Sequence, residues 1–155
     1  MKRVCESYAE QVQILTQSNL NGYNRLFGGQ LMEWIDIVAA VVARRHSGCN
    51  VTTAVVDLLE FKEPAYANDT IIITGRITYA GKTSMEIKVE TYIEELSRNK
   101  RLINTAYVIM VAIDESGKPV KVPELEIVTD EEKHEYEEAL LRRKRREEYK
   151  RATTL

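Results

Sequence analysis

One carboxylate interrupts the longest apolar stretch of the sequence. From residue 31 to residue 43, only Glu33 and Asp36 stand among apolar or small residues, and isoleucines flank Asp36 on both sides. Burying an unpaired carboxylate is costly, so a buried Asp36 needs a pairing partner or a function. A general base or a nucleophile is the function that suits a carboxylate there. The alternative is that Asp36 shares a narrow solvent-facing stripe with Glu33, and both interpretations stay open.

Two adjacent glycines, Gly28 and Gly29, come just before this stretch. Glycine lets another group approach the backbone closely, and the free N–H groups at the start of a helix attract negative charge. Such a helix start, with a carboxylate roughly two turns along it, could combine oxyanion stabilisation with a base or a nucleophile. The glycines could equally serve only to let the helix pack tightly on a sheet.

The cysteines and histidines point away from metal and redox chemistry. Cys5 and Cys49 share no metal-binding or redox spacing, which predicts free thiols. His46 and His134 lie 88 positions apart, so they cannot form a His-x-x-x-His zinc pair, and no metal site is expected. His46 has no serine or cysteine partner at a readable spacing and is not predicted to be catalytic.

One basic segment resembles the end of a phosphate-binding loop (P-loop). This segment consists of Gly81, Lys82, Thr83 and Ser84. A P-loop needs four residues between its glycines, whereas five separate Gly75 from Gly81, and the segment lies between two strand-like runs. The P-loop is therefore rejected, although these residues could contact a phosphate or an extended ligand as a hairpin turn.

Two further basic clusters each allow two interpretations. Arg44 and Arg45 are either the charged end of a helix or a phosphate-recognition site. The cluster from Arg142 to Arg146 is either a solvated helix face or a surface that attracts a nucleotide phosphate or an acidic partner.

Hydrophobic periodicity places these residues on one long helix and several strands. Residues 30–47 predict a helix that is apolar nearly all round and hence buried, closed by Gly48. Residues 85–94 alternate apolar and polar side chains, which predicts a strand with one face in water. Other strands are expected at 7–16, 51–61, 70–79 and 102–113, with a hairpin at 80–82. One buried helix with one antiparallel sheet is an α+β fold in which the sheet wraps the helix.

The last part of the chain predicts a second helix. Thr129 and Glu132 have capping-box spacing, and the segment begins with acidic residues and ends with basic ones, as the helix dipole favours. Its few apolar positions predict that it lies across the surface or projects. We therefore divide the chain into a single domain, residues 1–128, and a charged helical extension, residues 129–155. The basic end of this extension is a candidate for binding phosphates.

The composition argues against several classes of protein. The 155 residues suit one globular domain, and 44% hydrophobic and 30% charged residues are ordinary values. A formal net charge of −2 argues against a generally basic nucleic-acid binder. No apolar run approaches the roughly 20 residues of a membrane span, and the N-terminus has no apolar signal segment. We expect a cytoplasmic protein that contacts neither nucleic acid nor membrane.

Several segments occur in an order that is typical of one known family. The segment from Asn21 to Asp36 is followed by 43–46, 51–53, 57–64, 79–86, 111–114 and 122–123. Together they resemble hotdog-fold acyl-CoA thioesterases of the cytosolic acyl-CoA hydrolase type. The resemblance implies an α+β hotdog fold, in which an antiparallel sheet wraps a long central helix. It also implies a homo-oligomer of hotdog dimers, expected to be a hexamer, with active sites at the dimer interface.

The resemblance also implies roles for individual residues. Asp36 matches the family's acidic residue on the central helix, and Asn21 matches its loop asparagine, supplied from the opposite subunit. Gly28 and Gly29 would polarise the thioester carbonyl. The role of Arg25 is open, with ligand contact one option, because many relatives have a small residue before the Leu-Phe-Gly-Gly. The remaining substrate and CoA contacts are expected from Thr53, Gly81, Lys82, Thr83, Ser84, Arg44 and Arg45.

The implied reaction is hydrolysis of a small-molecule acyl-CoA to a free acid and CoA, without a cofactor beyond the CoA of the substrate. Asp36 would act as a general base or as a nucleophile that forms a mixed anhydride. Two other functions stay open. One is a sensor that binds acyl-CoA without cleaving it, and the other is a hotdog hydratase or dehydratase, which would need a catalytic histidine. The acyl-chain length cannot be read from the sequence.

Overall fold

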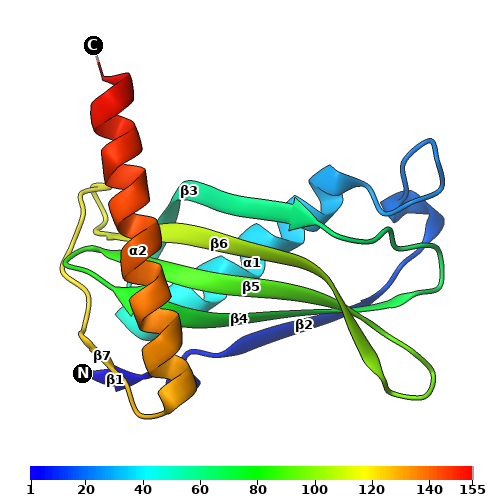
Figure 1. Cartoon of the computed structure of the whole chain (residues 1–155), viewed down its shortest axis with the longest axis horizontal. Helices are drawn as coiled ribbons and strands as arrows, with labels where there is room; N and C mark the ends of the chain where they lie inside the picture. The colour runs from blue at the N-terminus through cyan, green and yellow to red at the C-terminus, as the bar shows by residue number, and fades with distance from the viewer. Residues whose placement is uncertain (155) are drawn as a thin grey trace.

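The computed structural model describes residues 1–154, and its centre is a curved sheet wrapped around one helix (Figure 1). Helix α1 (Gly28–Ser47) lies on one face of the sheet, and helix α2 (Asp130–Thr153) crosses the other face and projects beyond it. The five antiparallel strands are β2 (Ala9–Ile14), β3 (Asn50–Phe61), β4 (Thr70–Ala80), β5 (Ser84–Glu94) and β6 (Lys100–Ile113). The smaller elements are β1 (Lys2–Arg3), paired in parallel with β7 (Leu125–Glu126), and the 3-10 turns η1 (Val4–Glu6) and η2 (Gln17–Asn19).

The strands are ordered β2-β4-β5-β6-β3, so β2 and β3 form the two edges of the sheet. The predicted α+β class, the hotdog arrangement and the hairpin between β4 and β5 are confirmed. Strand β3 departs from regular pairing between Thr53 and Val55 and again between Asp57 and Glu60. Neither helix, over the residues described, combines the length and apolar character that a membrane crossing requires.

Helix α1 approaches the sheet most closely at Gly75 of β4. A Cβ atom added there would lie 2.8 Å from Cγ1 of Val38 and 3.0 Å from Cγ2 of Val42, so a larger residue would push the helix away. The glycine that permits tight helix–sheet packing is therefore in the sheet and not at the helix start. At the other end of α1, Gly48 adopts the left-handed conformation (φ 70°) and caps the helix, as predicted.

The expectation that α1 is buried all round is wrong, because the sheet covers only one side of it. Ile35 and Ala39 are almost completely buried, whereas Met32 and Ile37 are 44% and 47% exposed. A single curved sheet reaches around only part of the circumference of a helix. Asp36 is half-buried, so it lies at the border of the uncovered stripe and not in the core.

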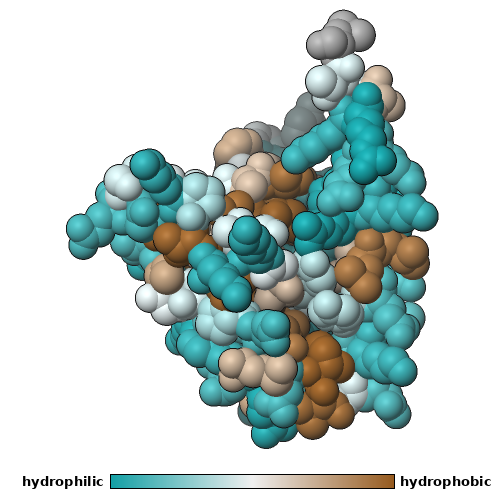
Figure 2. Space-filling view, turned by 90° about the vertical axis from the view of Figure 1, so that its left-hand side faces the viewer, coloured by the Kyte–Doolittle hydropathy of each residue, from teal (hydrophilic) through white to brown (hydrophobic). Residues whose placement is uncertain are grey.

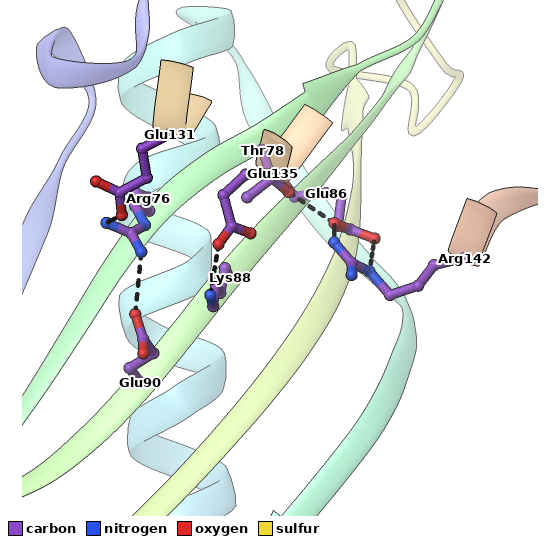
Figure 3. A network of polar contacts seen from close by, with 8 residues as sticks. All are labelled: Arg76, Thr78, Glu86, Lys88, Glu90, Glu131, Glu135 and Arg142. Carbon is purple, nitrogen blue, oxygen red and sulfur yellow. Dashed lines mark hydrogen bonds and ion pairs between the residues drawn. The ribbon is translucent and has the colours of Figure 1, made fainter. Parts of the chain in front are cut away.

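The outer face of β5 was expected to be exposed to solvent, but α2 covers part of it. The expectation is therefore wrong for Glu86, which lies under α2 (Figure 3). Glu86 is 1% exposed, and Arg142 of α2 donates two hydrogen bonds to its carboxylate, from Nη2 at 2.7 Å and from Nε at 3.1 Å. The Thr78 hydroxyl donates a third at 2.7 Å. The Arg142 guanidinium also lies 3.7 Å from the ring centroid of Tyr107. Burial opposes the positive charge of Arg142, but the bonds and charge of Glu86 outweigh it, and the pKa of Arg142 is raised.

More exposed ion pairs continue the attachment of α2 to the sheet. Lys88 lies 2.7 Å from Glu135 of α2, and Arg76 lies 3.3 Å from Glu131 of α2 (Figure 3). Arg76 also lies 3.3 Å from Glu90, which is a contact between β4 and β5. The pair between Glu86 and Arg142 is the most completely buried of these contacts, and breaking it would leave an uncompensated buried charge, so it is the main contact that fixes α2.

Replacing Arg142 by methionine is expected to lower the free energy of unfolding by about 3–5 kcal/mol, because the Glu86 carboxylate stays buried without its partner. Urea denaturation measures this loss. The matched control is Arg76→Met, which breaks the ion pairs of a side chain that is itself one-third exposed and should cost less than about 1 kcal/mol. Equal losses in the two variants would contradict the assignment of the buried pair as the main anchor.

His46 is completely buried at the end of α1 and holds the segment that leads to β7. Its Nε2 lies 2.8 Å from the carbonyl oxygen of Pro123, and because a carbonyl only accepts, Nε2 carries the hydrogen. Burial lowers the pKa of His46 below the ordinary 6.5, although the bond to Pro123 acts in the opposite direction. The residue is therefore neutral and structural, in agreement with the prediction that it is not catalytic.

The folded protein should lose stability as the pH falls below about 6.5, because the unfolded chain takes up a proton on His46 that the folded chain resists. Thermal unfolding between pH 7.5 and pH 5.5 tests this. His46→Gln keeps a donor for Pro123 and is expected to remove part of the acid sensitivity. His134→Gln, an exposed site on α2, should retain all of it. Identical pH profiles for the two variants would show that His46 is not the group responsible.

Candidate active site

The central polar contact on the open side of α1 joins Asp36 to Thr53. The Thr53 hydroxyl of β3 donates a hydrogen bond to Oδ1 of Asp36 at 2.6 Å. Helical periodicity turns Asp36 toward the border of the open stripe, and strand alternation turns Thr53 toward α1. One carboxylate oxygen is thus held in place by protein, while the half-buried side chain stays accessible. The stripe is therefore not merely a solvated helix face.

The start of α1 has free backbone donors, as predicted. Leu31 is the first residue whose N–H bonds within the helix, to the Phe27 carbonyl at 3.2 Å. No side chain among the described residues 1–154 caps the helix start. The Phe27 ring lies over Gly29, where an added Cβ would come within 2.7 Å of it. Gly29 thus accommodates the Phe27 ring, and the first backbone N–H groups of α1 keep no partner within residues 1–154.

The helix start and the carboxylate of one chain do not meet at one point. Asp36 is eight positions after Gly28, which is about 12 Å along a helix axis. A reacting carbonyl must lie about 3 Å from its donors and its base. The expected combination of oxyanion site and base within one helix is therefore corrected: if both act on one carbonyl, they come from different chains.

Asn21 lies in the loop before α1, and its side chain stabilises that loop. Its Oδ1 accepts hydrogen bonds from the backbone N–H groups of Tyr23 at 2.8 Å and Arg25 at 3.3 Å. Asn21 and Arg25 line a pocket of 160 Å³ together with Phe61 of β3. Since Gly28 also faces Phe61, both loop residues lie at the helix-start end of the molecule and not beside Asp36 of the same chain.

The predicted CoA-contacting hairpin lies at the other end of the sheet. The N–H of Gly81 donates to the Ser84 carbonyl at 2.8 Å, and Ser84 pairs with Val111 near the start of β3. The carbonyl oxygens of Lys82 and Thr83 are occupied by backbone donors of neighbouring segments. The hairpin is in contact with α2, since Arg143 donates to the Tyr79 hydroxyl beside it.

Arg44 and Arg45 are exposed at the C-terminal end of α1. Arg45 Nη1 donates to the Tyr8 carbonyl at 2.5 Å, so its guanidinium connects α1 to the start of β2. This contact favours the structural interpretation for Arg45. In the part of the chain that the structure describes, no three His, Cys, Asp or Glu side chains gather in a way that could hold a metal ion.

Sequence reasoning missed two contacts of this region. Thr53 was expected to bind the substrate and not to orient Asp36, because no local pattern links residues 17 positions apart. Arg146 was expected to be solvated or to bind phosphate, yet it lies 3.1 Å from Asp57 of β3. Neither contact can be inferred from the sequence, because each depends on where β3 lies relative to a helix.

Comparisons with known proteins agree with this fold and site. Residues 23–98 match the thioesterase superfamily. The chain is 38% identical over 113 residues to the uncharacterized acyl-CoA thioester hydrolase YkhA of Bacillus subtilis. The aligned residues make up 72% of this chain and 66% of that protein. It spans smaller shares of mammalian relatives, such as 23% of mouse acyl-coenzyme A thioesterase 11.

Solved structures resemble the whole chain. The acyl-CoA hydrolase of Staphylococcus aureus, solved with butyryl coenzyme A and coenzyme A, has a TM-score of 0.92 and 32% identity, covering 98% of this chain and 93% of that one. An apo-hexameric acyl-CoA thioesterase has a TM-score of 0.92 and 35% identity, with coverage of 99% and 98%.

The Staphylococcus aureus enzyme has also been solved with an asparagine, an aspartate or a threonine replaced by alanine. Those three residues are 15 and 17 positions apart, the same spacings that separate Asn21, Asp36 and Thr53. By its fold, its sequence and the extent of the match, the chain belongs to the thioesterase superfamily, among the hotdog acyl-CoA hydrolases.

Proposed function

We propose that the protein hydrolyses an acyl-CoA thioester to a carboxylic acid and free CoA. The observation that carries this proposal is the bond from Thr53 to Asp36 on the open side of α1. The matching spacing of three residues that were altered in the Staphylococcus aureus acyl-CoA hydrolase supports it. A hydratase or dehydratase is disfavoured, because His46 is buried and bonded to Pro123.

Asp36 has two chemical routes in this reaction. As a general base, its free oxygen takes a proton from water while the water oxygen attacks the thioester carbon. As a nucleophile, the carboxylate attacks that carbon and forms a mixed anhydride, which water then hydrolyses. In both routes the carbon–sulfur bond breaks and the thiolate of CoA takes up a proton. The Thr53 bond orients the carboxylate for either route.

A second copy of the chain would complete the site. The helix start lies about 12 Å from Asp36 of its own chain, so the donors that stabilise the oxyanion would come from the partner. Asn21 lies at the same end as this helix start and would arrive with it to position the water or the carbonyl. A homo-oligomer of hotdog dimers is therefore part of the proposal. The hexamer found for a thioesterase that is 35% identical favours three such pairs.

Asp36→Asn is expected to lower kcat for acyl-CoA hydrolysis at least about 100-fold, because the amide can accept the Thr53 bond but is neither a base nor a comparable nucleophile. Release of the CoA thiol measures the rate. The control is Glu33→Gln, which neutralises the exposed carboxylate three residues earlier on the same stripe and should keep near-normal activity. A folded Asp36→Asn variant with wild-type kcat would refute the mechanism.

Single-turnover hydrolysis in ¹⁸O-labelled water separates the two routes for Asp36. Label in the protein carboxylate indicates the anhydride, whereas label only in the acid product indicates the general base. Binding of acyl-CoA without thiol release by the wild-type protein would instead identify a sensor.

Thr53→Val should lower kcat about tenfold, since the carboxylate loses the donor that orients it while the side-chain volume is kept. Thr53→Ser retains a hydroxyl and is expected to keep most of the activity. In the Asp36→Asn background, the valine substitution should have little further effect, because the two residues act as a unit. Additive losses in the double variant would mean that Thr53 acts independently of Asp36.

A further inference from the structure

Arg25 lies in the loop before α1, and its charge has no paired carboxylate in the described part of the chain. The side chain is exposed, and none of the ion pairs within residues 1–154 includes it. The loop itself is fixed by two bonds between Asn21 and the backbone of Arg25. The Arg25 N–H donates to Oδ1 of Asn21 at 3.3 Å, and the Asn21 N–H donates to the Arg25 carbonyl at 2.8 Å. The backbone is therefore held in place while the guanidinium stays free for a ligand.

Arg25 stands beside the pocket of 160 Å³ at the start of α1, which we call the loop pocket. Within residues 1–154 Arg25 is the only cation that lines this pocket, and its one carboxylate, Glu63, already forms an ion pair with Arg101 at 3.3 Å. The other lining residues are mostly apolar: Leu26, Leu31, Phe61, Pro64, Ala65 and Ile103. The loop pocket thus combines apolar walls with one cation that has no carboxylate of its own.

These surroundings differ from those of the basic end of α2. Figure 2 shows that the projecting end of α2 carries mainly hydrophilic side chains. Charges on such a surface are screened by water and salt. A cation beside apolar walls is screened less, so it attracts an anion held next to it more strongly.

The loop pocket adjoins the helix start, where the thioester carbonyl is placed by the proposed function. Leu31 lines the pocket and is the first residue whose N–H bonds within α1. Phe61 also lines it, and its ring lies 3.6 Å from the position that a Cβ on Gly28 would take. Sites for drug-sized ligands have volumes of about 300–1,000 Å³, so this pocket holds only a small part of an acyl-CoA. The part attached directly to the carbonyl is the acyl group.

We propose that the loop pocket holds a short acyl group that ends in a carboxylate, and that Arg25 selects this carboxylate. The substrate class is then the CoA thioester of a short dicarboxylic acid. The methylene groups of the acyl chain contact the apolar walls, and the guanidinium donates charge-assisted hydrogen bonds to the terminal carboxylate. The small volume excludes long chains. The inference rests on the proposed function, because that function places the carbonyl at the helix start.

Glutaryl-CoA and pentanoyl-CoA are a matched pair of probes, because their acyl chains have the same number of carbons and only glutaryl ends in a carboxylate. Release of the CoA thiol gives kcat/KM for each, after subtraction of the enzyme-free rate, since the carboxylate of glutaryl-CoA can attack its own thioester. The wild-type protein should prefer glutaryl-CoA by about tenfold or more, the contribution expected of one charge-assisted contact.

The variant Arg25→Gln should lose most of this preference, and Arg25→Lys should keep part of it because it retains the charge. The matched control is Arg98→Gln, which removes an equally charged, 87% exposed arginine from the turn between β5 and β6, outside the loop pocket. This control should keep the wild-type preference. Arg25→Glu should instead prefer β-alanyl-CoA, whose acyl group ends in an ammonium, to propanoyl-CoA. An arginine that only stabilises the loop would not produce this exchange of preference.

Binding separates a failure of this inference from a failure of the proposed function. Calorimetric titration of both probes into the Asp36→Asn variant measures the preference without turnover. A wild-type protein that cleaves neither thioester, with a variant that still binds glutaryl-CoA about tenfold more tightly, would refute the hydrolase and retain the selection by Arg25. Equal rates and equal affinities for the two probes would support the hydrolase and overturn the selection. The selection is also overturned if Arg25→Gln leaves the preference unchanged or alters only the oligomeric state.

Discussion

The structure depends on how far one sheet can reach around one helix. Helix α1 is pressed against β4 at Gly75, where there is no room for a side chain, and the curved sheet then covers only the near side of the helix. The far side keeps Met32 and Ile37 exposed, with Asp36 at the border between the covered and the open surface. A carboxylate at that border escapes the full cost of burial and still has a fixed partner in Thr53. The same packing that forms the core thus produces the candidate active site.

Helix α2 is attached by a different kind of interaction. Its contact face is mostly polar, and within the described residues 1–154 the buried side chains of α2 are Ala139 and Arg142. Compared with apolar packing, a buried ion pair adds little net stability, but it requires one geometry, since a shifted helix would leave Glu86 buried and unpaired. The two bonds that Arg142 donates to Glu86 therefore set the position of α2 along the sheet. This position brings the basic end of α2 next to β3, where Arg146 lies 3.1 Å from Asp57.

The sequence was sufficient for the elements and insufficient for their partners. The strand alternation, the helix caps at Gly48 and Thr129 and the turn at Gly81 are local signals, and the structure has each of them. Which residues cover a face of a strand depends on contacts between segments that are far apart in the sequence. The alternation of β5 correctly indicated two faces, but Glu86 is covered by a residue 56 positions away. Asp36 could be singled out by its apolar neighbours, whereas Thr53 as its partner depends on where β3 lies against α1.

Two features of the molecule call for a second copy of the chain: the free edge of β3, and the distance between the start of α1 and Asp36. In residues 1–154, strand β3 pairs with β6 alone, so the other edge of this 12-residue strand keeps unpaired backbone groups. Val56 and Phe61 of the same strand are exposed. An edge of this length and character is a template for another strand. The helix start of one chain is about 12 Å from Asp36 of the same chain, too far for both to act on one carbonyl. A partner strand along β3 would satisfy the edge, and a partner that brings its own helix start to Asp36 would complete the site. One association could therefore meet both requirements, which is a physical reason for a small enzyme of this fold to be active only as an oligomer.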